Sequence, residues 1–477
     1  MNQEVLKKLY TQTVGVEPTE VIELPSSGSN RHYYRLKSEG KSLIGAIGTN
    51  LCENEAFLYM DEHFCEKGLN VPKVVAVSED RFCYLQEDLG DLSLFAAIEK
   101  GRLTRVFSEE EKQLITKTVR MLPEIQFNGA DSMDFSKCFP ASEFNSRSIL
   151  WDLNYFKYCF LKATGLEFDE DKLEDDFHTM TEVLLRSSSA TFMYRDFQSR
   201  NVMIKDGEPW FIDFQGGRKG PFYYDVASFL WQAKANFPDS LRKEFVADYI
   251  DALRKYQPVD ADEFNAQLRH FVLFRTLQVL GAYGFRGYFE KKPHFMQSVP
   301  FAIDNLRQLL NTPYLEYPYL TKILNELVNM KQFTDELEKH TLTVKVMSFA
   351  YKKGIPNDTT GNGGGFTFDC RAINNPGKYD RYKPYTGLDA KVIEFLEKES
   401  EVGTFLDHAY ALVDASVKRY MERGFTNLMV CFGCTGGQHR SVYCAQHMAE
   451  HINQKFNVKV ELIHREQNIE QIFHVKK

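Results

Sequence analysis

Two carboxylates and one amide occur in this sequence at a spacing that suits phosphoryl transfer. Asp196 precedes Asn201 by four intervening residues, and Asp213 follows the next apolar run. Transfer of a phosphoryl group to a hydroxyl needs one carboxylate to orient the acceptor proton. It also needs an amide oxygen and a second carboxylate to hold Mg²⁺ against the phosphates. We therefore predict that Asp196 is the catalytic base and that Asn201 and Asp213 are the metal ligands.

Short apolar runs must bring these three residues together. The run ATFM comes just before the segment that holds Asp196, VMI follows Asn201, and WFI precedes Asp213. Such runs are typical of short strands, and the spacing places the three polar groups at neighbouring strand ends. In the alternative interpretation, Asp196 and Asp213 are turn residues that close hairpins, but this leaves Asn201 unexplained.

The pattern around this segment predicts one α+β unit over residues 1–330, with a small lobe at 1–90 and a helical lobe at 91–330. A helical pattern covers 53–66, and amphipathic helices are expected over 93–185 and again from the end of the apolar ribbon to about 330. The predicted strands are 21–30, 32–40, 41–49, 71–78, 81–90, 190–195, 201–207 and 208–214.

The stretch YRDFQSRNVMIKDGEPWFIDFQGGRKGPFYYDVASFL (194–230) resembles the aminoglycoside phosphotransferase and choline kinase family. Members are small-molecule kinases with a bilobal, protein-kinase-like fold. SGSNRHYYRL (27–36), YLQEDLGDLSLF (84–95) and WDLNYFKY (151–158) follow the order of the family, and the sequence is most similar to kinases of N-acetylmuramate and N-acetylglucosamine. The resemblance covers about 1–330. It implies ATP and Mg²⁺ as cofactors and a sugar or amino sugar as the substrate.

The same resemblance implies roles for residues of the small lobe. The segment 27–30 would be the phosphate loop, where Gly28 lets backbone amides approach an anion because it has no Cβ. The segment 86–89 would be the hinge that pairs with adenine, and Asp225 would brace the catalytic loop. The residues assigned to ATP in this way are Ser27, Gly28, Ser29, Asn30, Arg31, Glu55, Glu87 and Leu89.

One position departs from the kinase pattern. Protein kinases carry a lysine on the third strand, paired with a helix glutamate, but the run 41–49 has only Lys41, at its start. Glu55 (or Glu53) can still begin the helix, and Arg31 or Arg35 would have to supply the positive charge. This departure and the lack of an A-P-E segment after Asp213 disfavour a protein kinase.

A second, smaller α/β domain is predicted at 342–477, after a charged linker at 331–341. Strands are expected at 342–351, 366–372, 426–434 and 458–465, and helices at 388–399, 403–424 and 441–456. Alternation of strands and helices predicts a doubly wound sheet.

A glycine-rich turn at 433–441 leads from a predicted buried strand into a helix. Backbone amides and a helix N-terminus at such a turn suit a phosphate, and His439 and Arg440 add donors and charge. The turn also matches C-x5-R-S, in which Cys434 would be a phosphatase nucleophile. Redox or zinc chemistry at Cys431 and Cys434 is disfavoured because no second cysteine pair accompanies them.

The motifs VKVMSFAYKKGIP, FDCRAINNPGKY, TGLD, GCTGGQHRS and IHRE resemble, in this order, the C-terminal domain of the RNase adapter protein RapZ. That resemblance implies binding of glucosamine-6-phosphate and a part in small-RNA recognition. An insertion at 359–365 lengthens the loop before FDCR, and no Walker motif G-x4-G-K-[ST] occurs in the chain. The residues assigned to the sugar phosphate are Asp369, Arg371, Cys434, Thr435, Gly436, Gly437, His439, Arg440 and His464.

The composition and charge of the chain limit which partners and which cellular location are expected. The 477 residues are 43% hydrophobic and carry a formal charge of −8, but from Thr341 onward 18 basic and 15 acidic residues give +3. So small an excess supports RNA binding only weakly. The sequence shows no membrane span and no secretory signal, and its nine cysteines are scattered, so we expect a cytoplasmic protein.

The sequence thus predicts an ATP- and Mg²⁺-dependent kinase of a sugar or amino sugar hydroxyl, fused to a regulatory domain that binds a sugar phosphate. Two other classes stay open. One is a non-catalytic nucleotide-binding regulator or RNA adapter that senses amino-sugar phosphate, and the other is a phosphatase that acts through Cys434.

Overall fold

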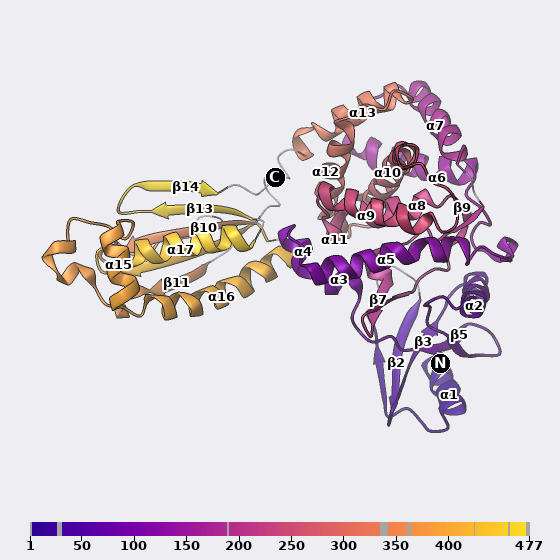
Figure 1. The fold of residues 1–477 in the computed structure, drawn as a ribbon, viewed down its shortest axis with the longest axis horizontal. Helices are drawn as coiled ribbons and strands as arrows, with labels where there is room; N and C mark the ends of the chain where they lie inside the picture. Colours follow the sequence, from indigo (N-terminus) through magenta and orange to yellow (C-terminus); the bar gives the residue numbers. More distant parts are fainter. Residues whose placement is uncertain are drawn as a thin grey trace. The chain divides into compact units, whose positions relative to one another are not determined.

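The computed structural model describes residues 2–25, 31–187, 190–333, 342–358, 360, 364–423, 425–456 and 458–473 (Figure 1). The chain divides into two compact units. The first is Met1–Arg102 with Val106–Val328, and the second is Asn329–Lys477 with Leu103–Arg105. Most of the linker predicted at 331–341 lies outside the described residues.

A five-stranded antiparallel sheet forms the small lobe of the first unit, with strand order β1-β2-β3-β5-β4. Helix α1 packs on this sheet, and its Leu6 and Tyr10 are buried with Leu36 and Leu85. The Asn50 side chain caps α2 by accepting from the backbone N–H of Glu53. The elements are β1 (Glu20–Glu23), β2 (His32–Ser38), β3 (Lys41–Ile47), β4 (Val74–Val77), β5 (Cys83–Glu87), α1 (Asn2–Val14) and α2 (Leu51–Glu66).

The larger lobe of the first unit is mostly helical and also contains two short strand pairs. Helix α10 is at its centre and contacts α6, α8 and α12. The helices are α3 (Leu94–Ala97), α4 (Glu99–Thr104), α5 (Glu109–Phe127), α6 (Ser146–Phe156), α7 (Glu170–Leu185), α8 (Tyr223–Leu230), α9 (Asp239–Leu253), α10 (Ala261–Gly284), α11 (Pro293–Met296), α12 (Val299–Leu310) and α13 (Pro318–Val328).

The strand pairs of this lobe place the predicted catalytic segment. Strands β6 (Thr191–Met193) and β9 (Arg218–Gly220) are paired, and so are β7 (Val202–Lys205) and β8 (Glu208–Phe211). Asp206 and Gly207 join β7 to β8 with φ of 53° and 78°. Positive φ at both central residues is the geometry of a tight hairpin turn, and Asp-Gly is a preferred pair for it.

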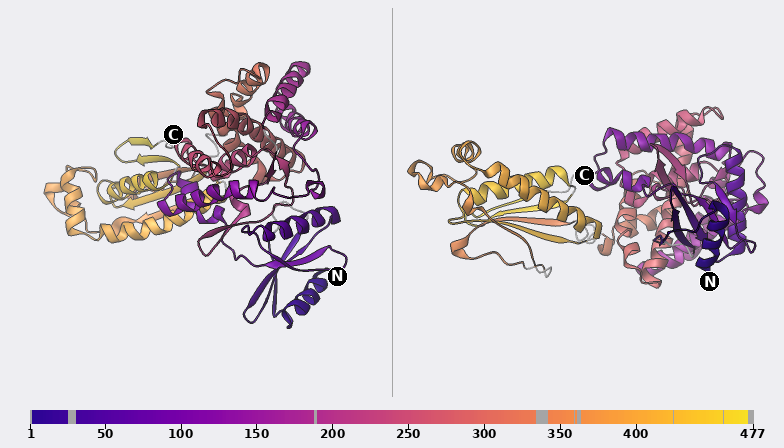
Figure 2. Two further views of the ribbon diagram at one scale, coloured as in Figure 1. Left: turned by 45° about the vertical axis from the view of Figure 1, so that its right-hand side comes forward. Right: turned by 90° about the horizontal axis from the view of Figure 1, so that it is seen from below.

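The second unit contains a five-stranded sheet with strand order β11-β12-β10-β13-β14 (Figure 2). Its first four strands are parallel, and β14 joins the edge in the antiparallel sense. The sequence pattern did not predict β14. The elements are β10 (Thr343–Ala350), β11 (Gly365–Asp369), β12 (Asn427–Cys434), β13 (Lys459–His464), β14 (Ile469–Phe473), α15 (Ala390–Glu399), α16 (Val402–Arg423) and α17 (Arg440–Lys455).

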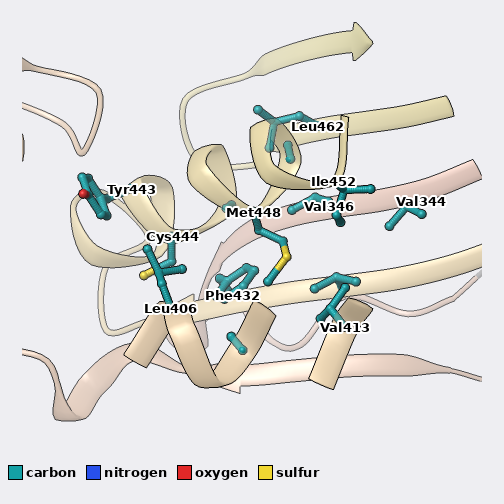
Figure 3. Close-up of a cluster of buried hydrophobic side chains, with 14 of the residues drawn as sticks. Val344, Val346, Leu406, Val413, Phe432, Tyr443, Cys444, Met448, Ile452 and Leu462 are labelled. Carbon is teal, nitrogen blue, oxygen red and sulfur yellow. The ribbon is translucent and has the colours of Figure 1, made fainter. Parts of the chain in front are cut away.

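The core of this unit lies on one face of the sheet. Figure 3 shows Val346 and Phe432 of the strands beside Met448 of α17 and Val413 of α16, and all four are fully buried. Alternate strand residues point to the opposite face, where Lys345 is partly buried and Cys431 is fully buried. The α/β class is confirmed, but α15, α16 and α17 all contribute to this one core, whereas a doubly wound sheet carries helices on both faces, so that part of the prediction is wrong.

The two-lobed α+β unit followed by a smaller α/β unit confirms the predicted fold class. Strand lengths differ from the prediction by a few residues, mainly because turns shorten them. None of the helices in the described part of the chain combines the length and the apolar character needed to cross a membrane.

Candidate functional site

The turn after β6 carries the predicted catalytic residue Asp196 and is held by a buried carboxylate. Asp225 of α8 is fully buried and accepts the backbone N–H groups of Tyr194 and Arg195, both at 2.9 Å. Gln126 of α5 donates to the same carboxylate at 3.2 Å. Burial raises the pKa of Asp225 to about 7, although these hydrogen bonds oppose the rise. Asp225 therefore determines the backbone path of the turn.

Two residues of this site have left-handed backbone conformations. Arg195 has φ of 74° and Asp213 has φ of 70°. Positive φ is uncommon in residues other than glycine, and such strain persists only where surrounding contacts hold the chain. The Asp225 carboxylate supplies such contacts at Arg195, where the strained backbone aims the next residue, Asp196, outward.

The structure brings Asp196, Asn201 and Asp213 together. The Asn201 amide nitrogen donates to the backbone oxygen of Asp196 at 2.9 Å and to the Asp213 carboxylate at 3.2 Å. Gln215 donates to the other Asp213 oxygen at 2.7 Å. Asp196 is exposed, whereas Asn201 and Asp213 are partly buried. An exposed carboxylate thus lies next to a pair of oxygen-bearing side chains.

The chemistry of this pair fits a magnesium ion. Mg²⁺ prefers oxygen ligands and commonly takes only one or two from the protein, with water and phosphate completing the shell. The Asn201 side-chain oxygen and the Asp213 carboxylate are two such donors. Within the described ranges no group of three or more His, Cys, Asp and Glu side chains could hold a metal. Burial raises the pKa of Asp213, and the neighbouring charge of Asp196 raises it further, so a cation placed here would relieve repulsion between carboxylates.

The predicted hinge at 86–89 begins in the last two residues of β5 and is held by several contacts. Leu89 is buried, and the Glu87 carboxylate accepts the backbone N–H of Lys73 at 3.3 Å. Between them Asp88 forms an ion pair of 2.7 Å with Arg35, which also contacts Asp91. Arg35 is therefore paired with carboxylates of the hinge and of the segment just after it.

The remaining residues assigned to ATP differ in where they lie and in what they contact. Ser27, Gly28, Ser29 and Asn30 lie outside the described residues. Arg31 is buried and pairs with Glu53 of α2 at 3.5 Å. Glu55 instead pairs with Arg81, and it lines a cavity of about 1070 Å³ between α2, β4 and residues 136–139.

That cavity contains none of the three predicted catalytic and metal-binding residues. Of the two glutamates that the sequence offered as the helix partner, Glu53 is the one that pairs with Arg31. The two glutamates are two residues apart on a helix and so point in different directions.

The glycine-rich turn of the second unit is built around a buried thiol. The Cys434 sulfur receives the backbone N–H of Gly437 at 3.2 Å and lies 3.1 Å from the Ser441 hydroxyl. Burial opposes ionisation of Cys434, but the bonds from Ser441 and Gly437 and the charge of Arg440 outweigh it and lower the pKa. Gly437 has φ of 67°, and a Cβ there would come within 2.9 Å of the backbone nitrogen of Ala350.

Side chains of this turn are tied to an earlier segment of the chain. Arg440 is buried, and its Nη1 donates to the backbone oxygens of Arg371 and Ile373, both at 2.8 Å. The His439 ring contacts the backbone oxygen of Tyr382 at 3.1 Å. Gln438, which sequence reasoning did not single out although it lies within the motif, donates to the backbone oxygen of Tyr385 at 2.7 Å. These contacts hold the turn open at Thr435 and Gly436, which are exposed.

Asp369 and Arg371, which were also assigned to the sugar phosphate, lie close to the turn. Asp369 and Arg371 form a two-point ion pair with distances of 2.9 and 2.6 Å, and both are exposed. Asp369 is paired in register with Gly433, the first residue of the turn. They are available to a ligand.

His464 is fully buried and bonded to Ser348 at 2.9 Å, and burial lowers its pKa to about 4. The structure therefore places His464 in the core and not on the exposed part of the turn.

Comparisons with known proteins support two separate family matches. The model of the phosphotransferase enzyme family (APH) matches residues 20–259, and the model of the RapZ C-terminal domain matches residues 342–468. A nucleotide-binding protein of Acidobacterium capsulatum is 38% identical over 131 residues, which are 27% of this chain and 41% of that protein. One of Listeria welshimeri is 37% identical over 137 residues, or 29% and 45%. The chain thus spans less than half the length of these relatives.

Solved structures with a similar fold include choline kinase LicA from Streptococcus pneumoniae. It is 14% identical with a TM-score of 0.43 and covers 64% of this chain and 99% of its own. The amicoumacin kinase hAmiN, solved with AMP-PNP, Ca²⁺ and Ami, is also 14% identical, with a TM-score of 0.46 and coverage of 68% and 100%.

Proposed function

This chain belongs to the phosphotransferase enzyme family, and from that premise we propose that its first unit transfers the terminal phosphoryl group of ATP to a hydroxyl of a sugar or amino sugar. The observation that carries this proposal is the convergence of an exposed Asp196 with Asn201 and Asp213, on a turn held by the buried Asp225. A decayed, non-catalytic relative would not be expected to retain this arrangement.

In the proposed reaction, the Asp196 carboxylate accepts a hydrogen bond from the acceptor hydroxyl and orients its oxygen toward the phosphoryl group. Asn201 holds Asp213 in place through its amide nitrogen, which leaves its oxygen available to a metal. Bound Mg²⁺ would neutralise charge on the phosphates. Asp225 keeps Asp196 in position, because it accepts both backbone N–H groups that precede it.

A sugar or amino sugar as acceptor is proposed on two grounds. The segments 84–95 and 151–158 resemble those of N-acetylmuramate and N-acetylglucosamine kinases. The second unit matches the RapZ C-terminal domain, which suggests that both units serve amino-sugar metabolism.

We assign binding of a sugar phosphate to the turn at 433–441. His439, which precedes α17, makes no side-chain hydrogen bond to cap it. The first-turn amides of a helix suit a phosphate, and the exposed Thr435 and Gly436 would border it.

The phosphatase alternative has one favourable observation, which is the lowered pKa of the Cys434 thiol. Its geometry is less favourable. A phosphatase arginine must bind the substrate phosphate, but Nη1 of Arg440 already donates to the backbone oxygens of Arg371 and Ile373. If the protein hydrolyses p-nitrophenyl phosphate, Cys434→Ser should abolish that activity, and unchanged hydrolysis would exclude Cys434 as the nucleophile.

The kinase proposal is tested by measuring ADP release against a panel of sugars and amino sugars. Asp196→Asn should lower kcat about 10²- to 10⁴-fold on the accepted sugar. The matched control is Asp206→Asn in the exposed hairpin turn, where asparagine tolerates the positive φ equally well. No sugar-stimulated turnover, or equal activity of Asp196→Asn and wild type, would refute the proposal.

A further inference from the structure

The β3 strand has no lysine where a kinase would need one. Lys41 is exposed at its start, whereas Ile44, Gly45 and Ala46 in its interior are buried. Ala46 is in register with Tyr33 on β2 and Tyr84 on β5. Side chains in register on neighbouring strands lie on the same face of a sheet. The two tyrosines therefore flank the small side chain of Ala46.

The guanidinium of Arg31, just before β2, lies against these same two tyrosines. Tyr33 and Tyr84 both interact electrostatically with Arg31, and the Tyr33 hydroxyl also hydrogen-bonds with it. Arg31 is only 2% exposed. The positive charge of Arg31 thus reaches the face of the sheet where Ala46 leaves room. It comes from the residue that precedes β2 and not from β3 itself.

Helix α2 holds this charge in place. Arg31 Nη2 donates to the backbone oxygen of Glu53 at 3.2 Å and lies 3.5 Å from its carboxylate. The Arg31 guanidinium carbon lies 5.5 Å from the ring centre of Phe57, one turn further along α2. Glu53 is on the first turn of α2, which is also where the Asn50 cap acts.

The same contacts reach the metal-binding carboxylate. Phe57 stacks on Phe214 with ring centres 5.1 Å apart, and Phe214 directly follows Asp213. The charges of Arg31 and Glu53 both act on the Asp213 carboxylate. Arg31 and Glu53 are therefore both within electrostatic range of the candidate magnesium site.

We propose that Arg31 binds the ATP phosphates in place of the missing strand lysine, and that Glu53 positions Arg31 and so couples α2 to the active site. The inference rests on the proposed kinase function. The guanidinium stays charged at every accessible pH and offers several planar donors to phosphate oxygens, whereas a lysine offers one compact charge. Arg31 and Glu53 would therefore take the place of the usual lysine–glutamate pair, with the positive charge supplied from the start of β2 instead of from β3.

The alternative is that Arg31 only stabilises the fold as a buried cation. The two roles are separated by titrating the full chain with ATP and with adenosine at a constant Mg²⁺ concentration. Adenosine lacks phosphates, so a phosphate contact affects ATP alone, whereas a loss of folding weakens both ligands. Binding needs no acceptor, so this test is independent of whether any sugar is phosphorylated.

Arg31→Met should raise the Kd for ATP roughly 10- to 100-fold and leave that for adenosine within about twofold. Arg31→Lys should recover part of the ATP affinity, since it restores the charge without the planar donors. Glu53→Gln should weaken ATP binding less than Arg31→Met, because the cation remains but loses its charged side-chain partner.

The matched controls are Arg81→Met and Glu62→Gln. Arg81 also pairs with a glutamate of α2, but this pair is exposed, and Glu62 is an exposed residue of the same helix. Both controls should keep the wild-type ratio of ATP to adenosine affinity. Three results would overturn the inference. Arg31→Met could keep the wild-type ratio of ATP to adenosine affinity, or it could lose affinity for both ligands equally. The third is that the wild-type protein does not prefer ATP to adenosine. If Arg31→Met does not fold, the ratio of ATP to adenosine affinity is measured for Arg31→Lys instead. A reduced ratio would support the inference, and a wild-type ratio would overturn it.

Discussion

The buried carboxylate of Asp225 leads to a prediction in which stability and pH are linked. Its Oδ1 accepts from Arg195, and its Oδ2 accepts from Tyr194 and Gln126. Asparagine has only one side-chain oxygen, so in Asp225→Asn an amide NH₂ would face one of the two backbone N–H groups. A buried donor without an acceptor costs about 1–3 kcal/mol.

The pH dependence follows from the raised pKa. Burial raises the pKa of Asp225 from 3.8 to about 7. Between these values the folded protein keeps a proton that the unfolded chain has released, so this residue makes the free energy of unfolding fall as pH rises. Above both pKa values, the decrease in the free energy of unfolding no longer changes with pH. A difference of about 3 pKa units corresponds to about 4 kcal/mol in total.

Urea unfolding between pH 4.5 and 8, followed by tryptophan fluorescence, measures this effect. Trp151, Trp210 and Trp231 are the three tryptophans of the chain, and all lie in the first unit. The stability advantage of wild type over Asp225→Asn should be largest at low pH and shrink by about 3 kcal/mol between pH 4.5 and pH 8, because part of the total change falls below pH 4.5. A difference that does not change with pH would refute the reasoning, and a difference that grows with pH would indicate a lowered pKa. Asp206→Asn, which changes an exposed carboxylate, is the control.

Three further predictions concern single residues. Asp213→Asn should raise the Mg²⁺ concentration needed for half-maximal ADP release several-fold, because it removes a charged ligand; an unchanged requirement would place the metal elsewhere. Gly437→Ala should destabilise the second unit and weaken binding of glucosamine-6-phosphate, because φ is 67° and the new Cβ would lie 2.9 Å from the Ala350 nitrogen; calorimetry with this ligand checks it, and wild-type affinity would contradict it. His464, whose pKa is lowered by burial to about 4, should make the second unit lose stability as pH falls from about 6.5 toward 4. His464→Gln should reduce that slope in circular dichroism melts, and an unchanged slope would exclude His464 as its source.

Much of the candidate site could be predicted from local spacing. Asp196, Asn201 and Asp213 lie within 18 residues of one another, and the apolar runs between them can form only short strands. The strand–turn–helix pattern likewise placed Cys434 at the end of β12 and Arg440 at the start of α17. In these segments, neighbours in sequence are also neighbours in space, so spacing alone determines which side chains meet.

Other contacts were decided by packing between distant segments. Glu53 and Glu55 are equivalent by sequence, and only the position of Arg31 on the neighbouring sheet selects Glu53. Arg440 is tied to carbonyl groups about 70 residues earlier in the chain, at Arg371 and Ile373. A motif shows that an arginine is present but not what it will contact.

Local patterns along the chain were enough to predict the class of each unit, the three polar groups around Asp196 and the glycine-rich turn at 433–441. Contacts between distant segments produce the burial of Asp225 and His464, the pairing of Arg31 with Glu53 and the packing of α15, α16 and α17 into one core. The physical reason is that periodicity and turn residues act over a few positions. Desolvation, and with it the pKa of a buried group and the partner of a buried charge, depends on which distant segments close over a side chain.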